Sequence, residues 1–191
     1  DCIAFIRRHF SEHVAFAFKG LKPGAFKADL FRYCYIYAKG GIYIDLDLMP
    51  IRSLDEILNH DVNFISCREN IRRHPHLNGI YQAFMAGEKH LEFLKVAITK
   101  IINNVYNKYY PPNHGDKLSH ILSITGPVLL YDSMNMKSKL SLGYCRIDYG
   151  NIFLYDYFND IYDLNKNKIF VNGIYTSSFD TYSSMFMNKD I

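Results

Sequence analysis

The sequence predicts an α/β fold with a single domain over residues 1–191. Stretches with apolar residues at helical spacing alternate along the chain with short β-branched and aromatic runs that are typical of strands. The hydrophobic content of 49% over 191 residues is enough to bury one sizeable core. In such a fold we expect a ligand to bind beyond the carboxyl ends of the strands.

Two helices are predicted first. Apolar side chains at helical spacing over residues 1–18 predict one amphipathic helix, which Pro23 and Gly24 interrupt. A second apolar stripe follows over residues 26–39, and Gly40 and Gly41 supply the stop signal expected after a helix. The second helix should therefore end at these glycines.

A short strand with two acidic residues at its end is predicted next. Residues 42–44, Ile-Tyr-Ile, are typical of a buried strand, which leads into Asp45, Leu46 and Asp47. In extended backbone the two carboxylates would point the same way and Leu46 the opposite way. Pro50 then limits any long continuation in a central strand.

The remaining signals continue the alternation of helices and strands. The capping-box spacing of residues 53–56 predicts a short helix through residue 58, and residues 62–67 predict a strand. Apolar periodicity predicts a long helix over residues 91–105, and Thr125-Gly126-Pro127 is typical of a helix start. From residue 144 onward, short aromatic and β-branched runs predict strands and irregular loops.

Composition excludes several classes of protein. The net charge is +3, with Lys and Arg scattered along the chain, which argues against a nucleic-acid partner. The chain has no run of 18 apolar residues and no signal-peptide pattern, so we expect no transmembrane segment. Its four widely spaced cysteines favour a reducing, cytoplasmic location. A Golgi lumen or a membrane surface is the alternative if the chain belongs to a longer, anchored protein.

The acidic pair suggests a metal site. Two like charges held side by side are costly unless a cation lies between them, and Mg²⁺ or Mn²⁺ binds to few carboxylates together with substrate phosphates. Asp45 and Asp47 are therefore candidate metal ligands; taken alone, they are more typical of two strand-end acids in a turn. Asp29 and Arg32 share a face of the preceding helix, either as a surface ion pair or as a site for sugar hydroxyls.

These residues together resemble a known family. The chain contains, in order, Ala28, Asp29, Arg32 and Tyr33, then after a helix's length Gly40-Gly41-Ile42-Tyr43, and then Asp45 and Asp47. This order is similar to the DXD-containing sugar-binding region of glycosyltransferase family 32. That family includes yeast mannosyltransferases, the inositol phosphorylceramide mannosyltransferases and, more distantly, the clostridial glucosylating toxins. Residues 52–55, 80–94 and 125–127 also look like family features, so the resemblance covers roughly the first two thirds of the chain.

The resemblance implies a GT-A fold, with a mixed central sheet flanked by helices, and retaining transfer of a hexose from UDP- or GDP-sugar. The acceptor would be a glycan, a lipid or a protein. Asp47 looks like the direct ligand of Mn²⁺ or Mg²⁺, and Asp45 like the acid that contacts the donor ribose and supports the metal through water. Asp29 and Arg32 match the positions that hold the donor sugar.

Three departures from the family pattern stand out. Gln82 stands where the family more often has Asn, and we keep it as a donor-sugar contact. Near the C-terminus, Tyr175 to Ser178 and Tyr182 stand where the family often shows a His followed by Ser-Trp that reaches the phosphates. The strand that normally opens the nucleotide site has no counterpart, so we expect either a reduced domain or a fragment.

Two alternatives remain open at the level of sequence. A strand-end D-x-D also occurs in phosphohydrolases that resemble haloacid dehalogenase, where it supplies an aspartyl nucleophile and an acid/base. That family favours Thr or Val where this chain has Met49, and it has a later acidic pair, whereas no Asp-Asp occurs in this chain. The other alternative is a degenerate glycosyltransferase that binds a sugar nucleotide or a partner without turnover.

Overall fold

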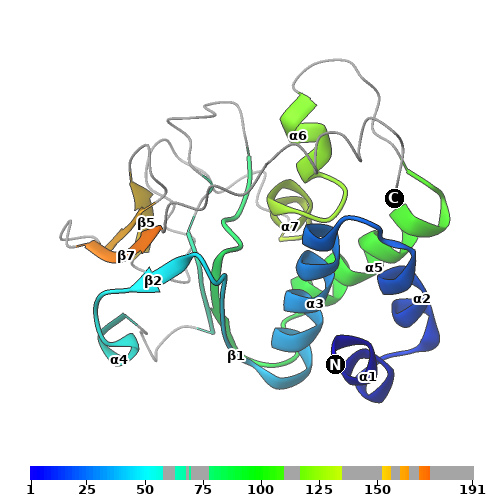
Figure 1. Cartoon of the computed structure of the whole chain (residues 1–191), viewed down its shortest axis with the longest axis horizontal. Helices are drawn as coiled ribbons and strands as arrows, with labels where there is room; N and C mark the ends of the chain where they lie inside the picture. Colours follow the sequence, from blue (N-terminus) through cyan, green and yellow to red (C-terminus); the bar gives the residue numbers. More distant parts are fainter. Residues whose placement is uncertain are drawn as a thin grey trace.

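The computed structural model describes residues 1–57, 63–67, 69, 78–109, 117–134, 152–155, 160–163 and 168–172. Figure 1 shows the larger helices packed together on one side of the molecule and the strands on the other. The helices are α1 (Cys2–His9), α2 (Glu12–Gly20), α3 (Gly24–Lys39), α4 (Leu54–Ile57), α5 (Glu92–Tyr106), α6 (Lys117–Leu122) and α7 (Pro127–Ser133). The strands are β1 (Gly41–Ile44), β2 (Leu48–Pro50), β3 (Phe64–Ile65), β4 (Phe84–Gly87), β5 (Ile152–Tyr155), β6 (Asp160–Asp163) and β7 (Lys168–Asn172).

The strands of the described residues form two sheets, with the orders β1-β4-β3 and β2-β7-β6-β5, and every pair is antiparallel. The combination of helices and strands is as predicted, but the single mixed sheet is wrong for these residues. Helix α3 leads directly into β1, and β4 leads back to α5, which packs against α3. The neighbouring strands β1 and β4 therefore run in opposite directions.

The N-terminal segment forms two helices, so the single helix expected over residues 1–18 is wrong. The backbone is extended at Phe10, with φ −135° and ψ 170°, and Ser11 is the N-cap residue of α2. The Ser11 side chain makes no capping hydrogen bond, and Glu12 adds a negative charge in the first turn, where the helix dipole favours one. The extended backbone at Phe10 and Ser11 defines the break, which the continuous apolar periodicity does not reveal.

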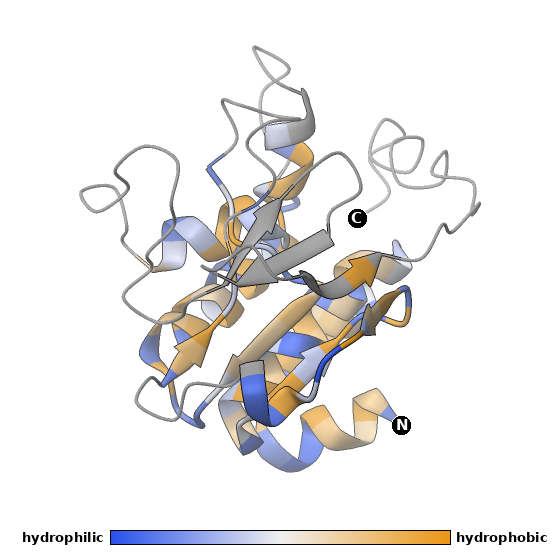
Figure 2. Ribbon diagram, turned by 90° about the vertical axis from the view of Figure 1, so that its left-hand side faces the viewer, coloured by the Kyte–Doolittle hydropathy of each residue, from blue (hydrophilic) through white to orange (hydrophobic). Residues whose placement is uncertain are grey.

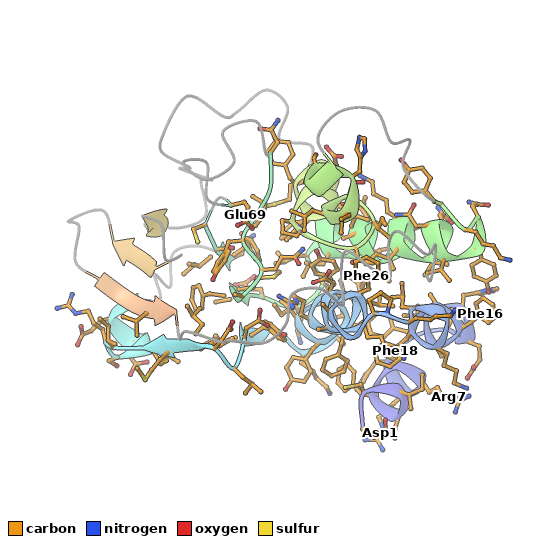
Figure 3. All side chains as sticks on the ribbon, turned by 45° about the horizontal axis from the view of Figure 1, so that its top comes forward. Asp1, Arg7, Phe16, Phe18, Phe26 and Glu69 are labelled. Carbon is orange, nitrogen blue, oxygen red and sulfur yellow. The ribbon has the colours of Figure 1, made fainter. Side chains whose placement is uncertain are left out.

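Helix α3 crosses the centre of the helical layer and ends as predicted. Phe26, Leu30 and Tyr33 are buried on it, and Phe26 lies toward the middle of the molecule in Figure 3, whereas Arg7 and Phe16 lie at its edge. At the C-terminal end, Gly40 has a φ of 69° and donates its N–H to the Ile36 carbonyl over 2.7 Å. Only glycine adopts this conformation readily, so α3 stops there and the chain turns into β1.

The described core has two parts, and apolar segments run through both helices and strands in Figure 2. The larger part lies between the helices and includes Ile6, Leu30, Ile80, Leu94, Ile98 and Leu130. The smaller part lies among the strands and consists of Leu48, Ile65, Cys67, Tyr81, Phe84 and Ala86. Burial of these side chains is the main force that holds α3 and β1 in place.

Other predicted elements are found with adjusted bounds. The Ser53 hydroxyl caps α4 by accepting the Asp55 N–H over 3.3 Å, and Pro127 occupies the first turn of α7. Strand β3 is shorter than predicted, and β4 and α6 had no clear signal in the sequence. The sequence predicts that the short helix α4 ends at residue 58, which lies outside the described residues. Much of the tail after residue 144 lies outside them as well. No helix in the described ranges has the length and apolar character needed to cross a membrane.

Candidate functional site

Asp29 and Arg32 come together with the acidic turn after β1. Both residues are on α3, and each is only 5% exposed. The expectation of a surface ion pair is therefore excluded, because several faces of α3 are covered by other elements. Arg32 reaches Asp45, which follows β1, whereas the carboxylate of Asp29 contacts Arg32 and Thr125.

Arg32 bridges two carboxylates. Its Nη2 lies 3.5 Å from Asp29 Oδ1 and 3.3 Å from Asp45 Oδ1. Three of the five predicted site residues, Asp29, Arg32 and Asp45, thus lie in one cluster, although Asp45 is on a different element from the other two. A buried guanidinium between two acids compensates part of the cost of removing all three charges from water.

The orientation of the Arg32 guanidinium is fixed on its other sides as well. Nη1 donates to the backbone carbonyl of Gln82 over 2.6 Å, and Nε donates to the Ala28 carbonyl over 3.3 Å. The guanidinium carbon lies 4.4 Å from the centre of the Tyr43 ring, within cation–π range. Arg32 therefore uses its planar fork of donors, which a lysine does not have.

Burial and charge shift the pKa values of this pair. The pKa of Asp29 is raised from 3.8 to about 6, mainly by burial and also by the charge of Asp45. Arg32 and a hydrogen bond from Thr125 oppose this increase. Burial acts to lower the pKa of Arg32, but Asp29 and Asp45 outweigh it, so that pKa lies above its ordinary value. Arg32 is thus a permanent cation, and Asp29 is an acceptor whose charge depends on pH near neutrality.

A hydrogen-bonded frame connects Asp29 with the start of α7. Thr125 Oγ1 donates to Asp29 Oδ2 over 2.7 Å, and both side chains are buried. The Tyr33 hydroxyl lies 3.0 Å and 3.3 Å from the carbonyl oxygens of Thr125 and Gly126, and the Gln82 side-chain amide donates to that hydroxyl. The side chain of Gln82 thus contacts the frame, while its carbonyl contacts Arg32.

The acidic residues lie in a turn between β1 and β2, so the expected extended arrangement of Asp45 and Asp47 is wrong. The Leu48 N–H donates to the Asp45 carbonyl over 3.0 Å, and Leu46 at the tip is 99% exposed. The chain has to change direction here, because β1 pairs with β4 in one sheet and β2 pairs with β7 in the other. Strand β1 itself is partly buried rather than fully buried.

Tyr43 holds the first acid of the turn. Its hydroxyl donates to Asp45 Oδ1 over 2.7 Å, so this oxygen receives a hydrogen bond as well as the charge of Arg32. Burial raises the pKa of Tyr43 above its ordinary value, despite the opposing charge of Arg32, so the hydroxyl remains a donor at neutral pH. The Asp45 side chain is still 32% exposed, and Asp47 is partly exposed.

The chemistry of the turn fits a divalent cation that is shared with a ligand. Within the described ranges, no hydrogen bond or ion pair engages the Asp47 carboxylate, and no group of three or more His, Cys, Asp or Glu side chains surrounds it. Mg²⁺ and Mn²⁺ accept carboxylate oxygens and are often bound by one or two carboxylates plus substrate phosphates. Asp47, supported by Asp45, can supply the protein part of such a site.

The sequence did not assign Tyr43, Thr125 or Tyr33 to the site. For Tyr43 a signal was available, since it lies two residues before Asp45 and side chains two apart in a strand share a face. Thr125 contacts Asp29 across 96 residues of sequence, and no local pattern indicates that contact. The motif at residues 125–127 was interpreted as a helix start and as a family feature, and neither interpretation assigned Thr125 a role in the site.

Comparison with known proteins identifies the region that contains the acidic turn. Residues 3–64 match the model of a glycosyltransferase sugar-binding region containing a DXD motif, which confirms the resemblance over those residues. An initiation-specific alpha-1,6-mannosyltransferase of Candida albicans is 33% identical over 62 residues. That alignment covers 31% of this chain and 16% of the relative, so most of the relative's length has no counterpart in the match.

Proposed function

We propose, from the match of residues 3–64 to a glycosyltransferase sugar-binding region, that this chain is the catalytic core of a retaining, metal-dependent hexosyltransferase with a GT-A fold. The donor would be a UDP- or GDP-hexose, and the acceptor a glycan, a lipid or a protein. The observation that supports this most strongly is the placement of Arg32 between Asp29 and Asp45, at 3.5 Å and 3.3 Å, directly beside the turn that carries Asp47.

The acidic turn would bind the diphosphate end of the donor. Asp47 would hold Mn²⁺ or Mg²⁺ directly, and Asp45 would support the ion and contact the ribose. The bound ion would neutralise charge on the departing nucleoside diphosphate as a Lewis acid. The protein's own contribution is to keep Asp45 in place, through the Tyr43 hydroxyl at 2.7 Å and the Arg32 guanidinium.

Asp29 and Arg32 would bind the hydroxyl groups of the donor sugar. An ionised carboxylate accepts and a guanidinium donates, so together they match hydroxyl groups, which do both. Their burial lowers the local dielectric, which strengthens hydrogen bonds made there compared with bonds in water. Gln82 would take part through its carbonyl, which fixes Arg32, and through its amide, which contacts the frame around Thr125.

A non-catalytic sugar-nucleotide-binding module is the second candidate. It is favoured by the burial of Asp29 and Arg32, whose side chains are only 8% and 6% exposed and already pair with each other. Such an ion pair stabilises the acidic turn whether or not the protein catalyses a reaction. Binding of a donor without release of its nucleotide would identify this function.

Nucleotide release tests the proposal directly. The protein is incubated with a panel of UDP- and GDP-hexoses and Mn²⁺, and free nucleotide and product are followed by mass spectrometry. We expect release with one donor class, and its loss with EDTA or in Asp47→Ala. Asp132→Ala is the matched control, since Asp132 is an exposed aspartate on α7 that takes part in none of the contacts described for the site.

Three outcomes would count against the transferase. Release that survives EDTA and Asp47→Ala would contradict the metal mechanism. Calorimetric binding of a donor with no release would favour the non-catalytic module. Hydrolysis of a simple phosphate ester, abolished by Asp45→Asn, would favour the phosphohydrolase instead.

A further inference from the structure

We propose that Thr125 is a positioning residue of the sugar site and holds the Asp29 carboxylate in the orientation that binds a donor hydroxyl. This inference rests on the proposed function and adds a residue outside the region that the family model matches, residues 3–64. Thr125 Oγ1 donates to Asp29 Oδ2 over 2.7 Å, and Thr125 is fully buried.

The two oxygens of Asp29 have different partners. Oδ1 lies 3.5 Å from Arg32 Nη2, and Oδ2 accepts the hydrogen bond from Thr125. The terminal torsion of an aspartate rotates easily, so one partner alone would leave the plane of the carboxylate loosely defined. Two partners on two sides fix that plane, and with it the directions of the lone pairs that remain for a sugar hydroxyl.

Thr125 is itself held from the same helix that carries Asp29. Tyr33 lies one turn after Asp29 on α3, and its hydroxyl lies 3.0 Å from the Thr125 carbonyl oxygen. Gly126 lets the start of α7 pack closely against the end of α6, because a Cβ there would meet the Leu122 carbonyl oxygen at 3.1 Å. Helix α3 thus contacts Thr125 twice: Tyr33 bonds to its backbone carbonyl, and Asp29 accepts the hydrogen bond from its hydroxyl.

The hydrogen bond also acts on the charge of Asp29. Burial raises the pKa of this carboxyl to about 6, and Asp45 adds to the increase, whereas Arg32 and the Thr125 hydroxyl oppose it. Removing the hydroxyl should therefore raise the pKa further and leave less ionised Asp29 at neutral pH. A protonated carboxyl is a poorer acceptor for a sugar hydroxyl, so both the orientation and the charge depend on Thr125.

Three variants of the full chain separate this role from a purely structural one. Thr125→Val removes the hydroxyl with little change in shape, and Thr125→Ser retains it. Ser133→Ala is the matched control: its hydroxyl is also buried, but it lies at the far end of α7 and donates to the Leu129 carbonyl within that helix. Thermal unfolding of each variant shows how much stability is lost in each case.

Two measurements are made on these variants. Calorimetric titration with the donor that wild type binds should show about tenfold weaker affinity in Thr125→Val, the loss expected for one hydrogen bond to a charged group. Thr125→Ser and Ser133→Ala should stay within about twofold of wild type. Titration of the Asp29 carboxyl by carbon-13 NMR should show a higher pKa in Thr125→Val and a nearly unchanged pKa in Thr125→Ser.

The inference is overturned if Thr125→Val leaves either the Asp29 pKa or the donor affinity unchanged, even when its stability falls. If wild type binds no UDP- or GDP-hexose, the proposed function fails, and the NMR titration still decides whether Thr125 controls Asp29. Should Thr125→Val not fold, Thr125→Cys gives the same comparison, because its thiol is only a weak donor.

Discussion

Arg32 Nη2 lies 3.3 Å from Asp45 Oδ1, and this ion pair joins the central helix α3 to the turn between β1 and β2. The same nitrogen lies 3.5 Å from Asp29 Oδ1. The Arg32 guanidinium therefore pairs with two acids on different elements, Asp29 on α3 and Asp45 in the turn after β1. Arg32 and the Tyr43 hydroxyl, which donates to the same Asp45 oxygen over 2.7 Å, together hold the start of the turn.

Arg32→Lys should destabilise the fold even though it keeps the charge. An ammonium cannot replace the donors that reach Gln82, Ala28 and the two acids at once, so we expect a loss of about 2 kcal/mol in the free energy of unfolding. Arg7→Lys is the matched control, because the Arg7–Glu12 pair is exposed and such pairs contribute about 0.5 kcal/mol or less. Urea denaturation measures both, and equal effects would show that Arg32 does not organise the site.

The pKa of Asp29 predicts a pH dependence of stability. The value is about 6 in the folded protein against an ordinary 3.8, so the folded state binds the proton more tightly than the unfolded state. Stability should therefore fall as pH rises from about 4 to about 6, by on the order of 3 kcal/mol in total, and stay at that reduced level above it.

Asp29→Asn isolates this contribution. The free energy of unfolding of wild type, minus that of the variant, should decrease between about pH 4 and pH 6 and be flat outside that range. Chemical denaturation at a series of pH values gives both curves. A difference that increases with pH instead would mean that Arg32 and Thr125 outweigh burial and that the pKa of Asp29 is lowered.

Two glycines at the ends of α3 should respond oppositely to alanine. At Gly40 the φ of 69° is unfavourable for alanine, and a Cβ would meet the Gly87 carbonyl oxygen and the Lys89 nitrogen at 3.1 Å. We expect Gly40→Ala to cost about 2 kcal/mol or more. At Gly24 a Cβ meets nothing within 4 Å, so Gly24→Ala should be neutral or stabilising by up to about 1 kcal/mol. Similar melting temperatures for the two variants would contradict this explanation of the helix end.

The sequence predicts best those features that local signals determine. Gly40 ends α3 because the required backbone angle is specific to glycine, and Pro127 starts α7 because its missing N–H is not needed there. The break at Phe10 and Ser11 was missed because apolar periodicity continues across it. The two-sheet arrangement was missed because it depends on pairing between distant segments, such as β2 with β7.

The candidate site shows the same division. Asp29, Arg32, Asp45 and Asp47 could be named from the motif, and the structure brings the first three into contact. The turn at residues 45–47 was the alternative interpretation of the two acids, and the extended arrangement was preferred because the alternation of side chains in β1 was continued past the point where the chain leaves its sheet. Thr125 was not recognised as a partner of Asp29, because the contact spans 96 residues and depends on the packing of α7.

Binding of a nucleoside diphosphate in the presence and absence of Mn²⁺ tests the central claim most directly. We expect UDP or GDP to bind wild type with a Kd at least about tenfold lower when Mn²⁺ is present, and Asp47→Asn to lose this enhancement while it unfolds at the same temperature as wild type. Calorimetry measures each affinity. Binding that is equally strong without Mn²⁺, or that Asp47→Asn leaves unchanged, would contradict the proposal that the acidic turn holds a metal and the donor diphosphate.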